Sequence, residues 1–150
     1  MAGVIGVVQT AEIASGTSKK TVLQILAGSN QRVKLREVSI SFKGTSGSQA
    51  PILVQVLRQT SAGAGGDAQT PLRMNESDDV TLRTTALVNI DGSEPTGTDE
   101  LLSEEVHPQG GYSWQAPWGG EIIIKSSNRV GVAVTAGAST TCVARFIFEE

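Results

Sequence analysis

Apolar and polar residues alternate along most of this chain, and a period of two is typical of strands that bury one face. In residues 129–136, Val130, Val132 and Val134 share one face, and Arg129 and Ala133 share the other. The C-terminal segment places four residues on one face: Cys142, Ala144, Phe146 and Phe148. No stretch longer than about ten residues has a helical period, so we expect an all-β chain.

Clusters of glycine, proline, serine and aspartate divide the chain into eight or nine short segments. A chain of 150 residues is long enough for one domain with a core of its own. We therefore predict an antiparallel β-sandwich with jelly-roll connectivity over residues 19–150, preceded by residues 1–18 as an N-terminal arm or first strand. The segment 100–108, "ELLSEEVHP", fits either a strand or a short helix. The glycines in residues 60–70 predict a mobile loop.

One segment changes the phase of its alternation. In residues 32–44, Val33 and Leu35 share one parity, whereas Val38 and Ile40 share the other. The change falls at residues 36–37, where a β-bulge or a bend between two sheets would return the apolar side chains to the core.

Half of the six aromatic residues lie in "GGYSWQAPWGG", residues 110–120. Tyr112 and Trp114 are two apart, so a strand would place both rings on one face, at the core or at a seam. Trp118 follows Pro117 and precedes two glycines, which predicts a position at or near the tip of a turn. Tryptophan is enriched at protein–protein hot spots, so Trp118 and Tyr112 are candidate interface residues. A sugar-stacking platform is the main alternative.

The N-terminal segment from residue 4 to residue 13 is apolar. It can serve as an arm that adds a strand to a neighbouring subunit, or as the first core strand of its own sandwich. In the first case the contacts would come from four residues: Val4, Ile5, Val7 and Val8.

Catalytic chemistry has few candidates in this sequence. His107, the only histidine, lies in "EEVHPQGG" without a nucleophile motif, and we expect it in a surface loop or an interface. Cys142, the only cysteine, lies among strand-forming residues, so we expect a buried, inert thiol. We predict no catalytic, cofactor-binding or metal-binding residue. A hydrolase would need Glu104 or Glu105 to face residue 78 or 79 across a groove.

The run "NESDDV", residues 75–80, superficially resembles a calcium loop. It lacks the glycine and the terminal glutamate of an EF-hand, and we interpret it as a solvated acidic loop.

The net charge of −3 argues against nonspecific binding to nucleic acid. The charge is uneven, since residues 1–74 carry +5 and residues 75–150 carry −8. The molecule is therefore two-sided unless the fold interleaves its halves.

The sequence has no apolar run long enough to span a bilayer, and its N-terminus lacks the basic region of a signal peptide. We therefore expect a protein that is made in the cytoplasm and does not enter a membrane.

The strand, glycine and aromatic plan of "HPQGGYSWQAPWGGEIII" and "NRVGVAVTAGASTTCVARFIFEE", with "VKLREVSISFKG" and "APILVQVLRQ", resembles the jelly-roll decoration proteins of tailed bacteriophages. These are also called cement or auxiliary capsid proteins. The resemblance covers about two thirds of the chain and lies in fold-like patterns, with no catalytic signature.

The resemblance implies a homotrimer without a cofactor that sits on the outer surface of the phage head. There it would clamp neighbouring subunits of the major capsid protein. The alternative is a carbohydrate-binding or receptor-binding β-sandwich module of a phage tail or head fibre.

Overall fold

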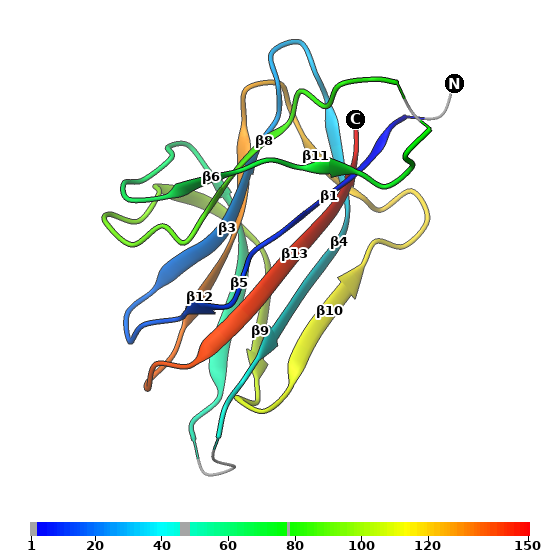
Figure 1. Ribbon diagram of the computed structural model, residues 1–150. Coiled ribbons are helices and arrows are strands. Elements are labelled where there is room, and N and C mark those ends of the chain that lie inside the picture. The colour runs from blue at the N-terminus through cyan, green and yellow to red at the C-terminus, as the bar shows by residue number, and fades with distance from the viewer. Residues whose placement is uncertain (1–2, 46–48, 78) are drawn as a thin grey trace.

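The computed structural model describes residues 3–45, 49–77 and 79–150, and this part of the chain contains strands and turns but no helix (Figure 1). Its strands are β1 (Ile5–Gln9), β2 (Ile13–Ala14), β3 (Lys20–Leu26), β4 (Val33–Phe42), β5 (Ile52–Gln59), β6 (Asp67–Gln69), β7 (Leu72–Arg73), β8 (Thr85–Val88), β9 (Gly97–Val106), β10 (Gly111–Gln115), β11 (Ile122–Ile124), β12 (Arg129–Thr135) and β13 (Thr141–Glu149). Among the described residues, nine strands have four residues or more, in agreement with the eight or nine expected segments.

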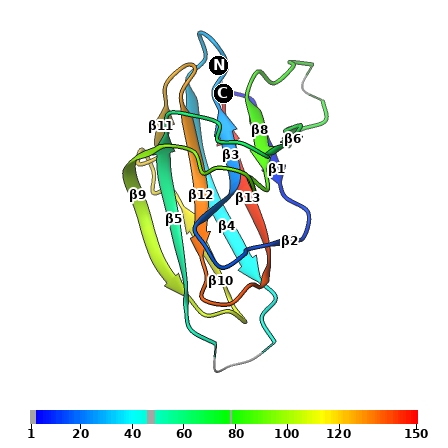
Figure 2. The ribbon, with the colours of Figure 1, turned by 90° about the vertical axis from the view of Figure 1, so that its left-hand side faces the viewer.

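The strands form two sheets, which pack face to face as a sandwich (Figures 1 and 2). The seven-stranded sheet has the order β10-β4-β13-β1-β7, with β11 paired to β4 and β2 paired to β13. The six-stranded sheet has the order β6-β8-β3-β12-β5-β9. Neighbouring strands run antiparallel, so the all-β antiparallel sandwich is confirmed. The jelly-roll connectivity stays a prediction.

Strands from the two halves of the chain alternate throughout the six-stranded sheet and in most of the seven-stranded sheet, where β1 and β7 are the exception. In the six-stranded sheet, β6, β3 and β5 come from residues 1–74, and each is followed by a strand from residues 75–150. In the seven-stranded sheet, β4 lies between β10 and β13, and β13 separates β4 from β1. The excess positive charge of the first half is thus distributed among the negative charges of the second, so the interleaved alternative holds and the two-sided one does not.

The core lies between the sheets and consists of the residues that the alternation selects. Val130, Val132 and Val134 of β12 are fully buried, and so are Phe146 and Phe148 of β13. The strand β3 is buried on both faces, whereas β5 alternates between buried and half-buried residues except at Val56 and Leu57, which are both buried.

The phase change in residues 32–44 is a β-bulge inside one sheet. Ile147 of β13 pairs with Glu37, and the next residue, Phe148, pairs with Leu35, so Arg36 is the extra residue on β4. Val33 and Val38, on either side of the bulge, are both fully buried. Since β4 stays in the seven-stranded sheet over its whole length, the bulge is the correct alternative and the bend between sheets is not.

The ambiguous segment "ELLSEEVHP" is a strand for most of its length. It belongs to β9, which pairs with β5 at the edge of the six-stranded sheet. Leu101 and Leu102 pack against the core, while Glu104 and Glu105 are exposed.

The glycine-rich residues 60–66 connect β5 to β6 and are held by backbone hydrogen bonds. The N–H of Ala64 donates to the carbonyl of Ser93 at 2.9 Å, and the N–H of Gly92 donates to the carbonyl of Ala64 at 2.9 Å. Gly63 and Gly65 have φ values of 68° and 81°, which other residues rarely adopt. The loop expected to be mobile is therefore anchored to residues 92–93 in this structure.

Candidate interaction surfaces

Trp118 lies at the tip of the turn between β10 and β11. The N–H of Gly120 donates to the carbonyl of Pro117 at 2.8 Å, and Gly119 has a φ of 75° at the third position of this turn. A positive φ at this position favours glycine. The Trp118 side chain is fully exposed, at 103% of its reference area. The turn thus presents a large aromatic ring to solvent on a short, hydrogen-bonded support.

Tyr112 and Trp114 face the other way. They lie on one face of β10, opposite Ile40 and Val38 of β4, and both pack half-buried against the core. Burial raises the pKa of Tyr112, and the negative charge of Glu104 raises it further. These two rings close the seam between the edge strands β10 and β9, so Tyr112 is a seam residue and is only partly available to a partner.

His107 lies in the turn between β9 and β10 with its side chain exposed. Its Nδ1 accepts a hydrogen bond from the N–H of Gln109 at 3.1 Å. His107 precedes β10 and Trp118 follows it, so a strand of five residues separates them, or about 17 Å. The two candidate interface residues therefore lie at opposite ends of β10 and do not form one patch.

The N-terminal candidates belong to a strand of the chain's own sheet. The strand β1 lies between β13 and β7, and Val4 exchanges two backbone hydrogen bonds with Glu150, at 2.9 and 3.0 Å. Val8 points into the core and is 2% exposed. Ile5 and Val7 point outward and are half-buried, so these two can take part in a contact.

Ile5 and Val7 form part of a continuous apolar surface on the outside of the seven-stranded sheet. Val7 pairs with Leu72 of β7 on one side and with Ile147 of β13 on the other. The N–H of Met74 donates to the carbonyl of Ile5 at 2.8 Å, which places Met74 beside Ile5. We call this surface the β1 face; it consists of Ile5, Val7, Leu72, Met74 and Ile147.

Three members of the β1 face, Leu72, Met74 and Ile147, were not among the sequence candidates. Leu72 is 66% exposed and Met74 is 55% exposed, although both are large apolar side chains. Their alternation in "PLRM" is the signal that indicates a short strand with one apolar face. Exposed apolar patches of this kind mark contacts with other proteins or ligands.

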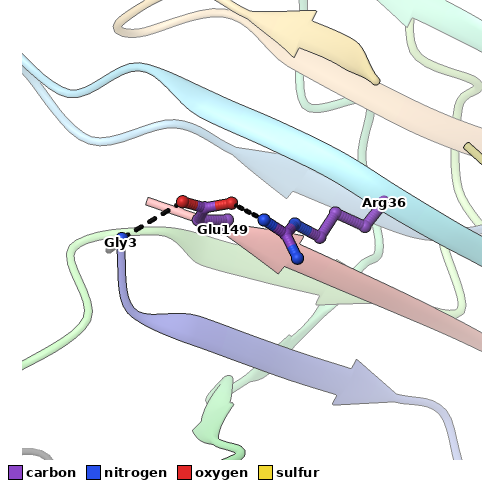
Figure 3. A network of polar contacts seen from close by, with 3 residues as sticks. All are labelled: Gly3, Arg36 and Glu149. Carbon is purple, nitrogen blue, oxygen red and sulfur yellow. Dashed lines mark hydrogen bonds and ion pairs between the residues drawn. The ribbon is translucent and has the colours of Figure 1, made fainter. Parts of the chain in front are cut away.

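Charged groups beside the β1 face are paired within the chain. Glu149 accepts hydrogen bonds from the guanidinium of Arg36 and, at 3.1 Å, from the N–H of Gly3 (Figure 3). Burial raises the pKa of Glu149, but the hydrogen bonds from Arg36 and Gly3 and the charges of Arg36 and Lys34 outweigh it and hold the pKa below its ordinary value. Arg145 donates to Glu37 at 2.6 Å. The face is thus apolar at its centre, and two ion pairs lie at its border.

Cys142 is buried on the inner face of β13, at 1% exposure. Burial raises the pKa of its thiol to about 11, against a smaller opposing effect of Lys20. The thiol is therefore protonated near neutral pH, as expected for an inert core cysteine.

Of the two acidic pairings that a hydrolase could use, the described residues test only the one with Asp79, and Asp79 does not face Glu104 or Glu105 across a groove. Glu104 and Glu105 lie on β9, at one edge of the six-stranded sheet. Asp79 lies beyond the other edge, where it lines a cavity of about 570 Å³ with residues of β6, β7 and β8. Asp78, the other half of this hypothesis and a part of "NESDDV", lies outside the described residues. Among the described residues, no three histidine, cysteine, aspartate or glutamate side chains group together as metal ligands.

Comparisons of the chain with protein-family models, with curated proteins and with solved structures found no match. In residues 3–45, 49–77 and 79–150, no helix is long and apolar enough to cross a membrane.

Proposed function

We propose that this chain is a noncatalytic structural protein of a tailed-phage particle, a decoration protein that assembles as a homotrimer on the outer surface of the head. The β1 face is the observation that carries the proposal, because it presents five apolar side chains on a regular sheet. The ion pairs at its border let the face contact a second copy of the chain, because an unpaired charge would be costly to bury there.

In this proposal the β1 face joins copies of the chain, and Trp118 is an anchor on the major capsid protein. Each trimer would carry three Trp118 side chains, and three weak contacts on one rigid body bind with an avidity well above that of a single contact. The trimer would bind only to a lattice whose spacing matches its own. The protein would be made in the host cytoplasm and end on the virion.

The mass of the protein in solution and its binding to phage heads test the proposal. Light scattering should give three times the chain mass, and labelled protein should sediment with heads that have expanded but not with unexpanded heads. Met74→Ser should reduce the mass toward that of one chain. The control Val80→Ser should not, since Val80 is equally exposed at 55% but is not a member of the β1 face. A monomer at micromolar concentration that does not bind heads would refute the proposal.

The exposure of Trp118 favours a second candidate, a carbohydrate-binding or receptor-binding module, because an exposed ring on a rigid turn can stack on a sugar. A glycan array distinguishes the two. Saturable binding of one glycan that Trp118→Ala abolishes would favour the second candidate over the decoration protein.

A further inference from the structure

Arg129 begins β12 and points to the outer face of the six-stranded sheet. It pairs with Leu26 of β3 and Gln59 of β5, in a strand whose next residue, Val130, is fully buried on the inner face. The arginine is half-buried, so part of its guanidinium is withdrawn from water.

Among the described residues, the Arg129 side chain has no hydrogen-bond acceptor and no ion-pair partner. Its Nε is inaccessible to solvent and makes no hydrogen bond. The Nε of Arg145 is also buried without a hydrogen bond, but Arg36, Arg58 and Arg145 each lie against a carboxylate, whereas Arg129 does not. The half-buried guanidinium has no counter-charge among the described residues, so an anion at its accessible donors would have a favourable site.

Two cavities meet at Arg129, and we call them together the Arg129 groove. The smaller, of about 210 Å³, is mainly apolar, with Leu26, Ala68 and Leu87 among its lining residues. The larger, of about 310 Å³, is polar, with hydroxyl and amide groups from the following residues: Thr60, Thr98, Ser127 and Asn128. A ligand at Arg129 therefore meets an apolar surface on one side and hydrogen-bonding groups on the other.

The polar residues below the groove are already paired with one another. Gln24 Nε2 donates to Gln59 Oε1 at 2.6 Å and to the carbonyl of Ser61 at 3.0 Å, and Gln59 Nε2 donates to Thr21 Oγ1 at 3.0 Å. Gly131 leaves room for the Gln59 amide, which a Cβ at this position would overlap. These bonds fix the floor of the groove without using Arg129.

The charge balance of the groove selects a monoanion. In the larger cavity, Arg58 lies 3.8 Å from Asp99, so this pair contributes no net charge. Arg129 is then the single unbalanced cation of the lining residues. A planar guanidinium fits a carboxylate through two parallel hydrogen bonds.

We propose that the Arg129 groove binds a small organic monocarboxylate, with the carboxylate on the Arg129 guanidinium and a short aliphatic group against Leu26 and Leu87. An amide or hydroxyl group of the ligand would extend toward Ser127 and Asn128. The inference goes beyond the proposed function and holds whether or not the chain assembles on a capsid.

N-acetyl-L-leucine is a suitable probe, because it combines a carboxylate, an isobutyl group and an amide. Titration of ¹⁵N-labelled protein should shift the amide signals of residues 127–130 and 85–87 with saturation. N-acetyl-L-leucinamide lacks the carboxylate, so its affinity should be at least about tenfold lower, as expected for the loss of a charge-assisted pair. Arg129→Gln should reduce the affinity for N-acetyl-L-leucine by a similar factor. The control Arg32→Gln, an exposed arginine outside the groove, should leave it unchanged.

A second variant tests the apolar part of the site without altering Arg129. Ala68 is exposed on β6 and lines the smaller cavity, so Ala68→Leu should fill the space for the isobutyl group and weaken binding while the protein stays folded. Three results would overturn the proposal: no saturable shifts with N-acetyl-L-leucine, equal affinity for the carboxylate and the amide, or equal affinity for inorganic phosphate.

Discussion

Trp114 and Trp118 are four residues apart and have opposite environments. Trp114 packs against the core from the edge strand β10, whereas Trp118 is fully exposed on the following turn. A tryptophan truncated in a core costs about 3–5 kcal/mol, and the half-buried position of Trp114 reduces this to about 2–3 kcal/mol. We predict this loss for Trp114→Ala and a change within about 0.5 kcal/mol for Trp118→Ala, measured by urea unfolding. Equal losses in the two variants would contradict the assignment of Trp118 to a contact surface.

Glu149 makes the stability of the fold dependent on acid pH. Its pKa in the folded chain is below the ordinary value of 4.5, so its ionised form stabilises the fold at neutral pH. This contribution is lost as the pH falls below about 4.5 and through the folded-state pKa. Glu149→Gln should lower the free energy of unfolding at pH 7 by up to about 1 kcal/mol and flatten its decline in acid.

The control for this experiment is Glu12→Gln. Glu12 pairs with Lys43 at 3.4 Å, but its side chain is 62% exposed, so water screens the pair. Urea unfolding at several pH values should give a curve for Glu12→Gln that follows the wild-type curve. A curve for Glu149→Gln that is parallel to wild type throughout would show that the contacts in Figure 3 do not stabilise the fold.

At the scale of single strands, the attachment of β1 to β13 depends on a glycine. A Cβ at Gly6 would lie 2.5 Å from Cζ of Phe148 and 2.7 Å from its Cε2, and Phe148 is fully buried. Gly6→Ala should therefore destabilise the protein by about 1–3 kcal/mol, since a packed ring must move. Gly137→Ala is the matched control, because nothing lies within 4 Å of its added Cβ. Thermal unfolding of both variants would measure the difference, and a neutral Gly6→Ala would mean that β1 shifts freely on its neighbour.

The sequence predicts those elements that follow from alternation along one segment. The bulge in β4 is an example, because Val38 and Ile40 can enter the same core as Val33 and Leu35 only if one extra residue is inserted. The seam position of Trp114 and the buried Cys142 follow from parity in the same way.

Features that depend on pairing between distant segments could not be predicted from the sequence. The β1 face needs Leu72 of β7 beside Val7 and Ile147, which are separated by most of the chain. Arg129 also has no local signal, since its isolation depends on which groups β3, β5 and the loop of residues 60–66 place around it. The anchoring of that loop to residues 92–93 is likewise a long-range contact, so composition alone predicted mobility.

At the scale of the whole molecule, the interleaved halves convert an uneven charge distribution into local ion pairs. Arg36 with Glu149, Arg58 with Asp99 and Arg145 with Glu37 each join a residue from the first half to one from the second. The chain thus lacks the simple division into a positive and a negative side that its sequence halves allow.

Cys142 can report the opening of the sandwich, because it is the one thiol of the chain and is buried near the start of β13. At pH 8, Ellman's reagent should not label the native protein in the time in which it fully labels the protein in urea. The labelling rate should rise with urea in parallel with global unfolding. Ser113→Cys is the positive control, since Ser113 is exposed on β10 and its thiol should react at once. Rapid labelling of Cys142 without urea would show that β13 detaches locally.

The alternation of first-half and second-half strands also determines the order of events during synthesis. When the first 74 residues have left the ribosome, β3 and β5 are present, but β12, which must lie between them, has not been made. Neither sheet can then form completely. The edges of β3 and β5 stay unpaired until β12 has been made, and those of β4 and β1 until β13 has been made. Sheets built from such distant segments fold slowly, in milliseconds to seconds. Nascent chains must therefore be kept apart from one another until β12 and β13 have been made.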